Sequence, residues 1–268
     1  MSKLRGQTYD GASNMIGRES GVAARIKEVQ PKALVTHCHG HSHNLTVKDV
    51  SKECSSVRNT LGTAGEICVL VKYSPKRENL LGDIQKSIEF ADETSDNNIV
   101  TLDKLCPTRW TVRAGCCKKI LEAYEPLFDL WELSLEKGKL DTDVKSRIIG
   151  CQAQMKKFDF LGGLNLGYKF YSLTDNLSRA LQSKKMSAVS GQRLARQTMS
   201  MFEKMRNDRD AKLLFDLVKQ NASKITRIKE PALGRQKNTP RYATINFLDG
   251  CTSSAVTRHP EAPADHFR

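Results

Sequence analysis

The stretch Tyr9-Asp10-Gly11-Ala12-Ser13-Asn14-Met15 lies where a predicted strand ends and a predicted helix begins. Residues 4–9 have an extended pattern, Asp10-Gly11 ends it, and Ser13 or Asn14 can cap the following helix. Apolar residues then recur at helical spacing as far as Pro31, and residues 33–36 form a second short strand. This strand–helix–strand order is typical of an α/β core.

A single apolar seam runs through the next segment, from Val47 to Val71, at alternating spacings of three and four. It predicts one helix of about seven turns, ended by Pro75. The helix would either form a coiled-coil dimer or pack on its own domain. The seam is short and built from small residues, with Gly62 and Gly65 inside the helix, which favours packing on its own domain. Residues 74–105 are polar and mixed.

From residue 108 onward the pattern is helical almost throughout. Several apolar stripes follow one another with hardly any strand signal, which indicates an antiparallel helical bundle. We expect Pro126 to kink the first stripe and Trp131 to lie in the core. The chain is therefore predicted to be mostly helical, with an α/β segment followed by an all-α region. The stripes occupy residues 112–131, 144–158, 166–181, 195–205 and 214–228.

The chain is strongly basic, with a net charge of +13 and a pI of about 9.4. Such an excess favours polyanionic partners, because each neutralised phosphate releases counterions. No stretch approaches the roughly 20 apolar residues of a membrane span, and no signal peptide is visible. We therefore expect an intracellular protein with no membrane partner. The eight cysteines are irregularly spaced and are predicted to be reduced thiols.

Two further stretches carry residues that could do chemistry: His37-Cys38-His39-Gly40-His41-Ser42-His43-Asn44-Leu45 and Cys106-Pro107-Thr108-Arg109-Trp110. Cys38 and His41 have the Cys-x-x-His spacing of half a zinc site. Cys116-Cys117 is not spaced as a second pair, so zinc is not expected. Arg109 could hold a phosphate and Trp110 could stack on an unpaired base. The alternative for Trp110 is a buried side chain at the start of the helical region.

In this order, the three stretches resemble the transposase domain of the hAT superfamily, particularly the zinc finger MYM-type protein 1-like group. Residues 158–164 and 176–182 resemble the helical insertion that hAT transposases carry inside their RNase H-like core. The resemblance covers about residues 4–241. It implies an incomplete RNase H-like core over residues 1–105 and a helical insertion over 106–231. Residues 232–268 would then be a linker and a disordered tail.

The resemblance also assigns roles to residues. Transposases of this class use two divalent ions held by three carboxylates. Asp10 corresponds to the second of the three, a vestigial Mg²⁺ or Mn²⁺ ligand, while the first aspartate and the final glutamate are expected outside this chain. Cys38 and His41 would orient the catalytic loop, and Arg109 and Trp110 would contact DNA. The local alternative is that Asp10 only caps the following helix.

We therefore expect a fragment of a transposase-derived nuclear protein that binds DNA or protein without strand transfer of its own. One alternative is a metal-dependent nuclease completed by missing segments or by a partner in a homo- or hetero-oligomer. The other is a protein-interaction scaffold on which the basic charge is incidental. Residues 91–96 resemble the stretch that carries the first aspartate, but they follow Asp10 and are predicted to be a solvated loop. Because a two-stranded sheet is marginal alone, its strands are expected to be partly exposed.

Overall fold

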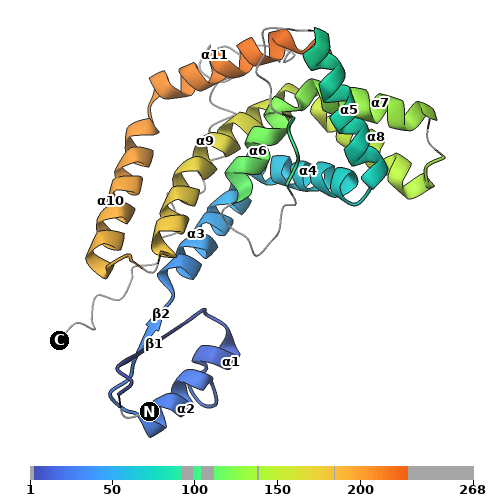
Figure 1. Cartoon of the computed structure of the whole chain (residues 1–268). Coiled ribbons are helices and arrows are strands. Elements are labelled where there is room, and N and C mark those ends of the chain that lie inside the picture. Colours follow the sequence, from blue (N-terminus) through green and yellow to red (C-terminus); the bar gives the residue numbers. More distant parts are fainter. Residues whose placement is uncertain (1–2, 92–98, 104–111, 138, 184, 229–268) are drawn as a thin grey trace.

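The structure is a computed structural model that describes residues 3–91, 99–103, 112–137, 139–183 and 185–228. The protein is mostly helical and contains one small parallel sheet (Figure 1). Arg109, Trp110, the predicted loop at 92–96 and the predicted tail at 232–268 lie outside the described residues. Among the described residues, no helix has both the length and the apolar character needed to cross a membrane.

The N-terminal unit has the predicted strand–helix–strand order. Strands β1 (Gly6–Tyr9) and β2 (Leu34–His37) pair in parallel, with Gly6 opposite Leu34 and Tyr9 opposite His37. The crossover contains the short helix α1 (Ser13–Ile16) and helix α2 (Val22–Val29). The buried Gln7 side chain ties the crossover to the sheet, because its Nε2 donates to the carbonyls of Ala23 at 3.3 Å and Ala33 at 3.5 Å.

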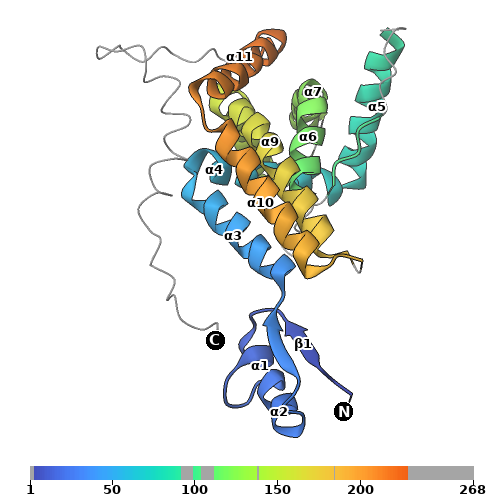
Figure 2. The ribbon, with the colours of Figure 1, turned by 90° about the vertical axis from the view of Figure 1, so that its left-hand side faces the viewer.

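Nine helices follow in the described part of the chain and pack into a bundle (Figures 1 and 2). Helix α3 leads directly out of β2, and α9 is the longest helix, packed against α3, α4, α6, α8, α10 and α11. The helices are α3 (His39–Glu53), α4 (Ser55–Lys72), α5 (Pro75–Ala91), α6 (Arg113–Glu122), α7 (Tyr124–Lys137), α8 (Thr142–Met155), α9 (Phe158–Leu181), α10 (Ala188–Met205) and α11 (Asp208–Lys224).

Two helices replace the single helix predicted over 47–71. The backbone is extended at Cys54, with φ −83° and ψ 103°, so the seam is divided between α3 and α4. The apolar spacing continues in phase across this break, so the spacing alone did not predict it. Helix α4 packs against α8 and α9 of its own chain, as the second interpretation of the seam predicted.

Helix α5 occupies much of the polar and mixed segment 74–105, where the sequence pattern indicated no helix. Pro75 is the first residue of α5, a position where the missing N–H of proline costs nothing. Leu81 and Ile84 are buried, and α5 packs on α7. The narrow apolar stripe of α5 lies among many charged residues, so its helical period was weak in the sequence.

The core is built around the aromatic side chains of α7. Trp131, Tyr124 and Phe128 are almost completely buried, as predicted for Trp131. The Trp131 indole N–H donates to the Met155 Sδ at 3.3 Å. The predicted kink at Pro126 is instead a break at Ala123, and Pro126 lies in the first turn of α7. A proline fits there because the first N–H groups of a helix have no intrahelical acceptor.

Candidate nucleic-acid interface

The residues of the first two sequence stretches meet at one edge of the small sheet. Because β1 and β2 are parallel, Asp10 and Cys38 follow the carboxyl ends of neighbouring strands. The Cys38 N–H donates to the Tyr9 carbonyl at 2.8 Å, which extends the pairing to this edge. The topology therefore places Asp10 beside the beginning of α3, where His41 lies.

Asp10 is exposed and does not cap a helix. Its Oδ1 accepts a long hydrogen bond of 3.4 Å from the Ala12 N–H, which closes a local turn before α1. The loop rests against His37, since a Cβ added to Gly11 would lie 3.0 Å from the His37 Nε2. The structure thus puts Asp10 on an open loop against the histidine stretch.

The histidine stretch forms the first turn of α3. The His37 Nδ1 lies 2.8 Å from the Ser42 Oγ, and the rings of His37 and His41 are 6.5 Å apart. Cys38 occupies the N-cap position of α3 without a side-chain capping bond. Within the described ranges, no three histidine, cysteine, aspartate or glutamate side chains are grouped so that they could hold a metal ion. The described residues therefore do not supply the ligand set of a two-metal centre.

Helix α9 holds the start of α3 through polar contacts. The His43 Nε2 lies 3.1 Å from the Thr174 carbonyl, and the Ser178 hydroxyl donates to the Asn44 Oδ1 at 2.8 Å. One helical turn away, the buried Tyr171 hydroxyl donates to the Ser51 Oγ at 2.6 Å. Burial raises the pKa of Tyr171 to about 12. The helix that carries His41 is thus fixed on α9 rather than on the sheet.

The same part of α9 also holds the start of α6. The Asp175 Oδ2 accepts a hydrogen bond of 3.2 Å from the Ala114 N–H, which belongs to the first turn of α6. The Asp175 carboxylate caps α6, because the side chain of Val112 at the N-cap position has no atom that can accept a hydrogen bond. Burial raises the pKa of Asp175 to about 6, against the lowering effect of that hydrogen bond and of the nearby arginines.

The Asp175 contact matters for the third sequence stretch. Arg109 and Trp110 lie outside the described residues, but they directly precede α6 in the chain. The structure therefore brings the helix that follows Arg109-Trp110 and the helix that carries His41 onto the same segment of α9. Asp175 and its neighbours were missed in the sequence analysis. The available signal was a polar stripe at helical spacing, with Tyr171, Thr174, Asp175 and Ser178 beside the apolar one.

The cysteines do not form a second zinc pair. Cys116 and Cys117 are buried in the core, and the Cys116 Sγ lies 3.5 Å from the Cys68 Sγ. Burial raises the pKa of Cys117 to about 12, so its thiol stays protonated and unreactive. The prediction of reduced thiols is confirmed at five of the described cysteines and was wrong at Cys54, which is disulfide-bonded; the five free thiols are Cys38, Cys68, Cys116, Cys117 and Cys151.

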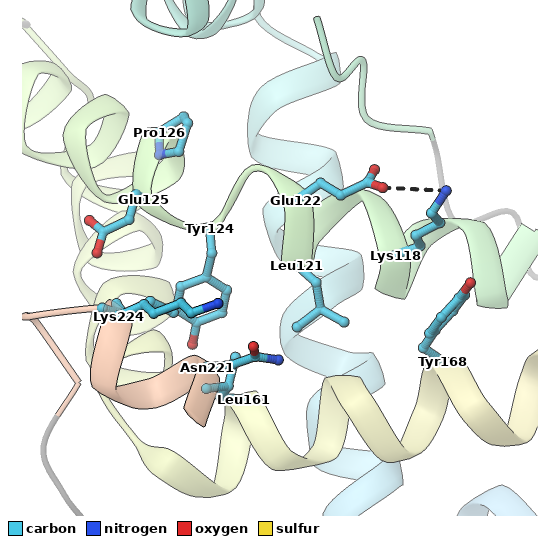
Figure 3. A pocket seen from close by; sticks show the side chains of 11 residues that line it. Lys118, Leu121, Glu122, Tyr124, Glu125, Pro126, Leu161, Tyr168, Asn221 and Lys224 are labelled. Atoms are coloured by element: carbon cyan, nitrogen blue, oxygen red, sulfur yellow. Dashed lines mark ion pairs between the residues drawn. The ribbon is translucent and has the colours of Figure 1, made fainter. Parts of the chain in front are cut away.

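A hollow of about 330 Å³ lies on the other side of the bundle, between α6, α7, α9 and α11 (Figure 3). Leu121, Leu161 and Ile225 supply apolar lining, and Lys118 is paired with Glu122 at 3.3 Å. The lining contains no histidine, cysteine or aspartate, and none of the sequence-predicted site residues. Its chemistry is therefore not that of the strand edge.

Comparison with known proteins gives a distant relationship. The chain is 26% identical over 189 residues to the human protein named 52 kDa repressor of the inhibitor of the protein kinase, which covers 68% of this chain and 24% of that protein. It is 29% identical over 130 residues to the mouse protein of the same name, covering 48% and 16% respectively. The matched part is thus a quarter or less of each relative's length. No protein-family model matches the chain, and no solved structure matches it significantly.

Proposed function

We propose that the chain is a piece of a hAT transposase-derived protein, and that it binds DNA in the nucleus without strand-transfer activity of its own. In this proposal residues 1–105 derive from an RNase H-like core and 106–231 from its helical insertion. The distant homology to the human and mouse repressors supports a shared ancestry. The order of the three sequence stretches supports the hAT assignment.

The exposed surface of β2 is the observation that best supports an origin in a larger sheet. Leu34 is 71% exposed and Val35 is 42% exposed, and these neighbours in one strand point to opposite faces. In α/β proteins a parallel sheet is covered on both faces. On both faces of β2, apolar side chains are left uncovered. We expect this if, in the ancestral protein, further strands and helices covered the sheet.

DNA binding is supported by the net charge of +13 and by the position of the sequence stretches. The strand edge with Asp10 lies beside the start of α3. The starts of α3 and α6 are both hydrogen-bonded to the same segment of α9. Strand transfer is not proposed, because it requires several carboxylates around two metal ions, and Asp10 has no such partners among the described residues. A single exposed carboxylate binds Mg²⁺ weakly.

Binding to hairpin-ended and blunt duplex DNA, measured by fluorescence anisotropy at 50 mM salt, tests the proposal. Loss of the base-stacking Trp110 in Trp110→Ala should weaken hairpin binding by roughly 5- to 150-fold and blunt-duplex binding much less, which corresponds to about 1–3 kcal/mol for one stacked base. Tyr73→Ala, which removes an exposed aromatic ring elsewhere, should leave both affinities unchanged. Equal binding of hairpin DNA by both variants and the unmodified chain would remove Trp110 from the proposal.

A second outcome would favour the nuclease alternative. If the chain nicks DNA in Mn²⁺ and Asp10→Ala abolishes the nicking, then carboxylates from outside the described residues or from a partner chain complete a metal site. A protein-interaction role takes support from the relatives' name, which describes repression of an inhibitor. Absence of DNA binding at low salt would leave that role as the better proposal.

A further inference from the structure

Helix α10 carries a basic face that no part of the functional site uses. Arg193, Arg196, Gln197, Ser200 and Lys204 recur at the spacing of one helical face. All of them except the half-buried Ser200 are exposed. We call these five residues the α10 stripe. Figure 2 shows α10 lying across the bundle, with no described helix in front of it.

The opposite face of α10 holds the helix in place. Gly191 and Thr198 are buried, and the Phe202 ring packs against Phe170 of α9 with ring centroids 5.4 Å apart. The Ser187 hydroxyl accepts a hydrogen bond of 3.1 Å from the Ser190 N–H and caps the helix. Since packing and capping are supplied by these residues, the charges of the α10 stripe are not needed to build the helix.

Unlike several other cations of the bundle, the cations of the α10 stripe form no ion pair with a described residue, although the exposed Glu203 directly precedes Lys204. Lys118 pairs with Glu122 at 3.3 Å, and Arg147 reaches Glu66 and Asp143. By contrast, none of the three stripe cations lies within 4.0 Å of a carboxylate oxygen from any described residue. Arg193 and Arg196 stand one turn apart, an arrangement of like charges that destabilises a helix by a few tenths of a kcal/mol.

The dimensions and chemistry of the α10 stripe fit a nucleic-acid backbone. At about 1.5 Å per residue, Arg193 to Lys204 span roughly 16 Å. One DNA strand carries a phosphate every ~3.4 Å of helix axis, so about five phosphates lie within that length. Gln197 and Ser200, between the cations, can donate to phosphate oxygens. A protein-binding face would instead have aromatic or aliphatic anchors at its centre. The exposed Met199 and Met201 lie at the margins of the stripe, and the exposed Val189 lies one turn before its first residue, so no apolar side chain lies between its cations.

We propose that the α10 stripe binds the phosphate backbone of double-stranded DNA and supplies a large part of the salt-dependent affinity. This inference rests on the proposed function, and it adds a second contact surface, separate from the strand edge at Asp10. Three cations engage three phosphates, without sequence preference. Contacts of this kind fix the orientation of a protein on the duplex, while base recognition takes place elsewhere.

The test compares two variants of the full chain that lose the same charge. The first, R193Q/R196Q/K204Q, neutralises the stripe. The control, K52Q/K86Q/K118Q, neutralises three exposed lysines that are paired with acids on their own helices. The affinity for a blunt 30-base-pair duplex is measured across a salt series, and circular dichroism verifies that both variants are folded. Three lost phosphate contacts should flatten the slope of log K against log salt by about 2.7, at about 0.9 for each contact. The control should change the slope by less than about 1.

Each outcome separates this inference from the proposed function. A flattened slope in the stripe variant alone supports the inference. Binding by the unmodified chain with an unchanged slope in the stripe variant overturns it and leaves DNA binding intact. Equal flattening in both variants also overturns it, because net charge would then be the cause. No binding by the unmodified chain overturns the proposed function as well. Stripe-dependent binding of poly-glutamate as tight as that of DNA would overturn the choice of ligand.

Discussion

The crossing of α4 and α9 at Gly163 makes a demanding prediction for Gly163→Ala. A Cβ at this position would lie 2.0 Å from the Thr60 Oγ1, 2.9 Å from the Thr60 Cβ and 3.3 Å from the Ser56 carbonyl oxygen. Rotation of the Thr60 side chain removes the first clash but not the second, because the Cβ is fixed to the backbone. The two helices must therefore move apart, in a region where the core is closely packed.

The magnitude follows from two opposing effects. Replacement of glycine by alanine inside a helix gains up to about 1 kcal/mol in helix propensity. Overpacking a core typically costs about 1–3 kcal/mol and sometimes more, and the 2.9 Å contact with the Thr60 Cβ, which rotation cannot relieve, places Gly163→Ala at the severe end. We expect Gly163→Ala to lower the free energy of unfolding by about 1–3 kcal/mol, which lowers Tm by roughly 3–10 °C in a protein of this size.

Gly62→Ala is the matched control, because Gly62 lies on α4 itself and its added Cβ would meet nothing within 4 Å. At Gly62 the substitution changes only the helix propensity, so the free energy of unfolding should rise by up to about 1 kcal/mol. Urea denaturation followed by circular dichroism and by the fluorescence of the buried Trp131 measures both variants. Combining Gly163→Ala with Thr60→Ala should recover part of the loss. A Gly163→Ala variant as stable as the unmodified chain would refute the α4–α9 packing.

Three further predictions concern charge and exposure. Burial raises the pKa of Asp175 in the folded state from 3.8 to about 6. The folded chain therefore binds this proton more tightly than the unfolded chain, and it loses stability as the pH rises from about 4 to 6. In thermal scans, Asp175→Asn should remove that loss of stability, whereas Asp159→Asn, at an exposed site, should not. Arg227 forms ion pairs with three acids of α7. Arg227→Gln should therefore lower the free energy of unfolding by about 1–2 kcal/mol at low salt and by less at 0.5 M salt. An equal loss of stability at both salt concentrations would show that these ion pairs are not its cause. Hydrogen exchange should be faster in β1 and β2 than in α4 and α9, because a two-stranded sheet with exposed faces opens readily, and slower exchange in the strands would contradict this.

Much of the fold was predictable where apolar spacing is regular. The pattern indicated α8, α10 and α11 because each buries one face and exposes the other. The breaks at Cys54 and Ala123 were not predictable, since the apolar period runs through both without interruption. Helix α5 was missed because its apolar stripe is narrow, and what buries Leu81 is contact with α7. Such contacts depend on distant parts of the chain.

Part of the candidate site was also predictable from the sequence, and part was not. The strand–helix–strand order was sufficient to predict that Asp10 and Cys38 follow neighbouring strands, and a parallel pair then puts them at one edge. Asp175 could not be assigned a role in advance, because its partner, Ala114, lies 61 residues away in the chain. The α10 stripe was present in the sequence as spacing, but which face of α10 stays exposed depends on the packing of Phe202 against Phe170 of α9, 32 residues away in the chain.

Electrostatic binding of DNA by this chain is tested most directly by a salt titration of the unmodified protein. The dissociation constant for a 30-base-pair duplex is measured at 50, 100 and 200 mM salt. With at least three phosphate contacts, affinity should fall by about 40-fold or more between 50 and 200 mM, since each contact contributes a slope of about 0.9. Absence of binding at 50 mM, or an affinity that salt leaves unchanged, would contradict the claim and would favour a protein-interaction role.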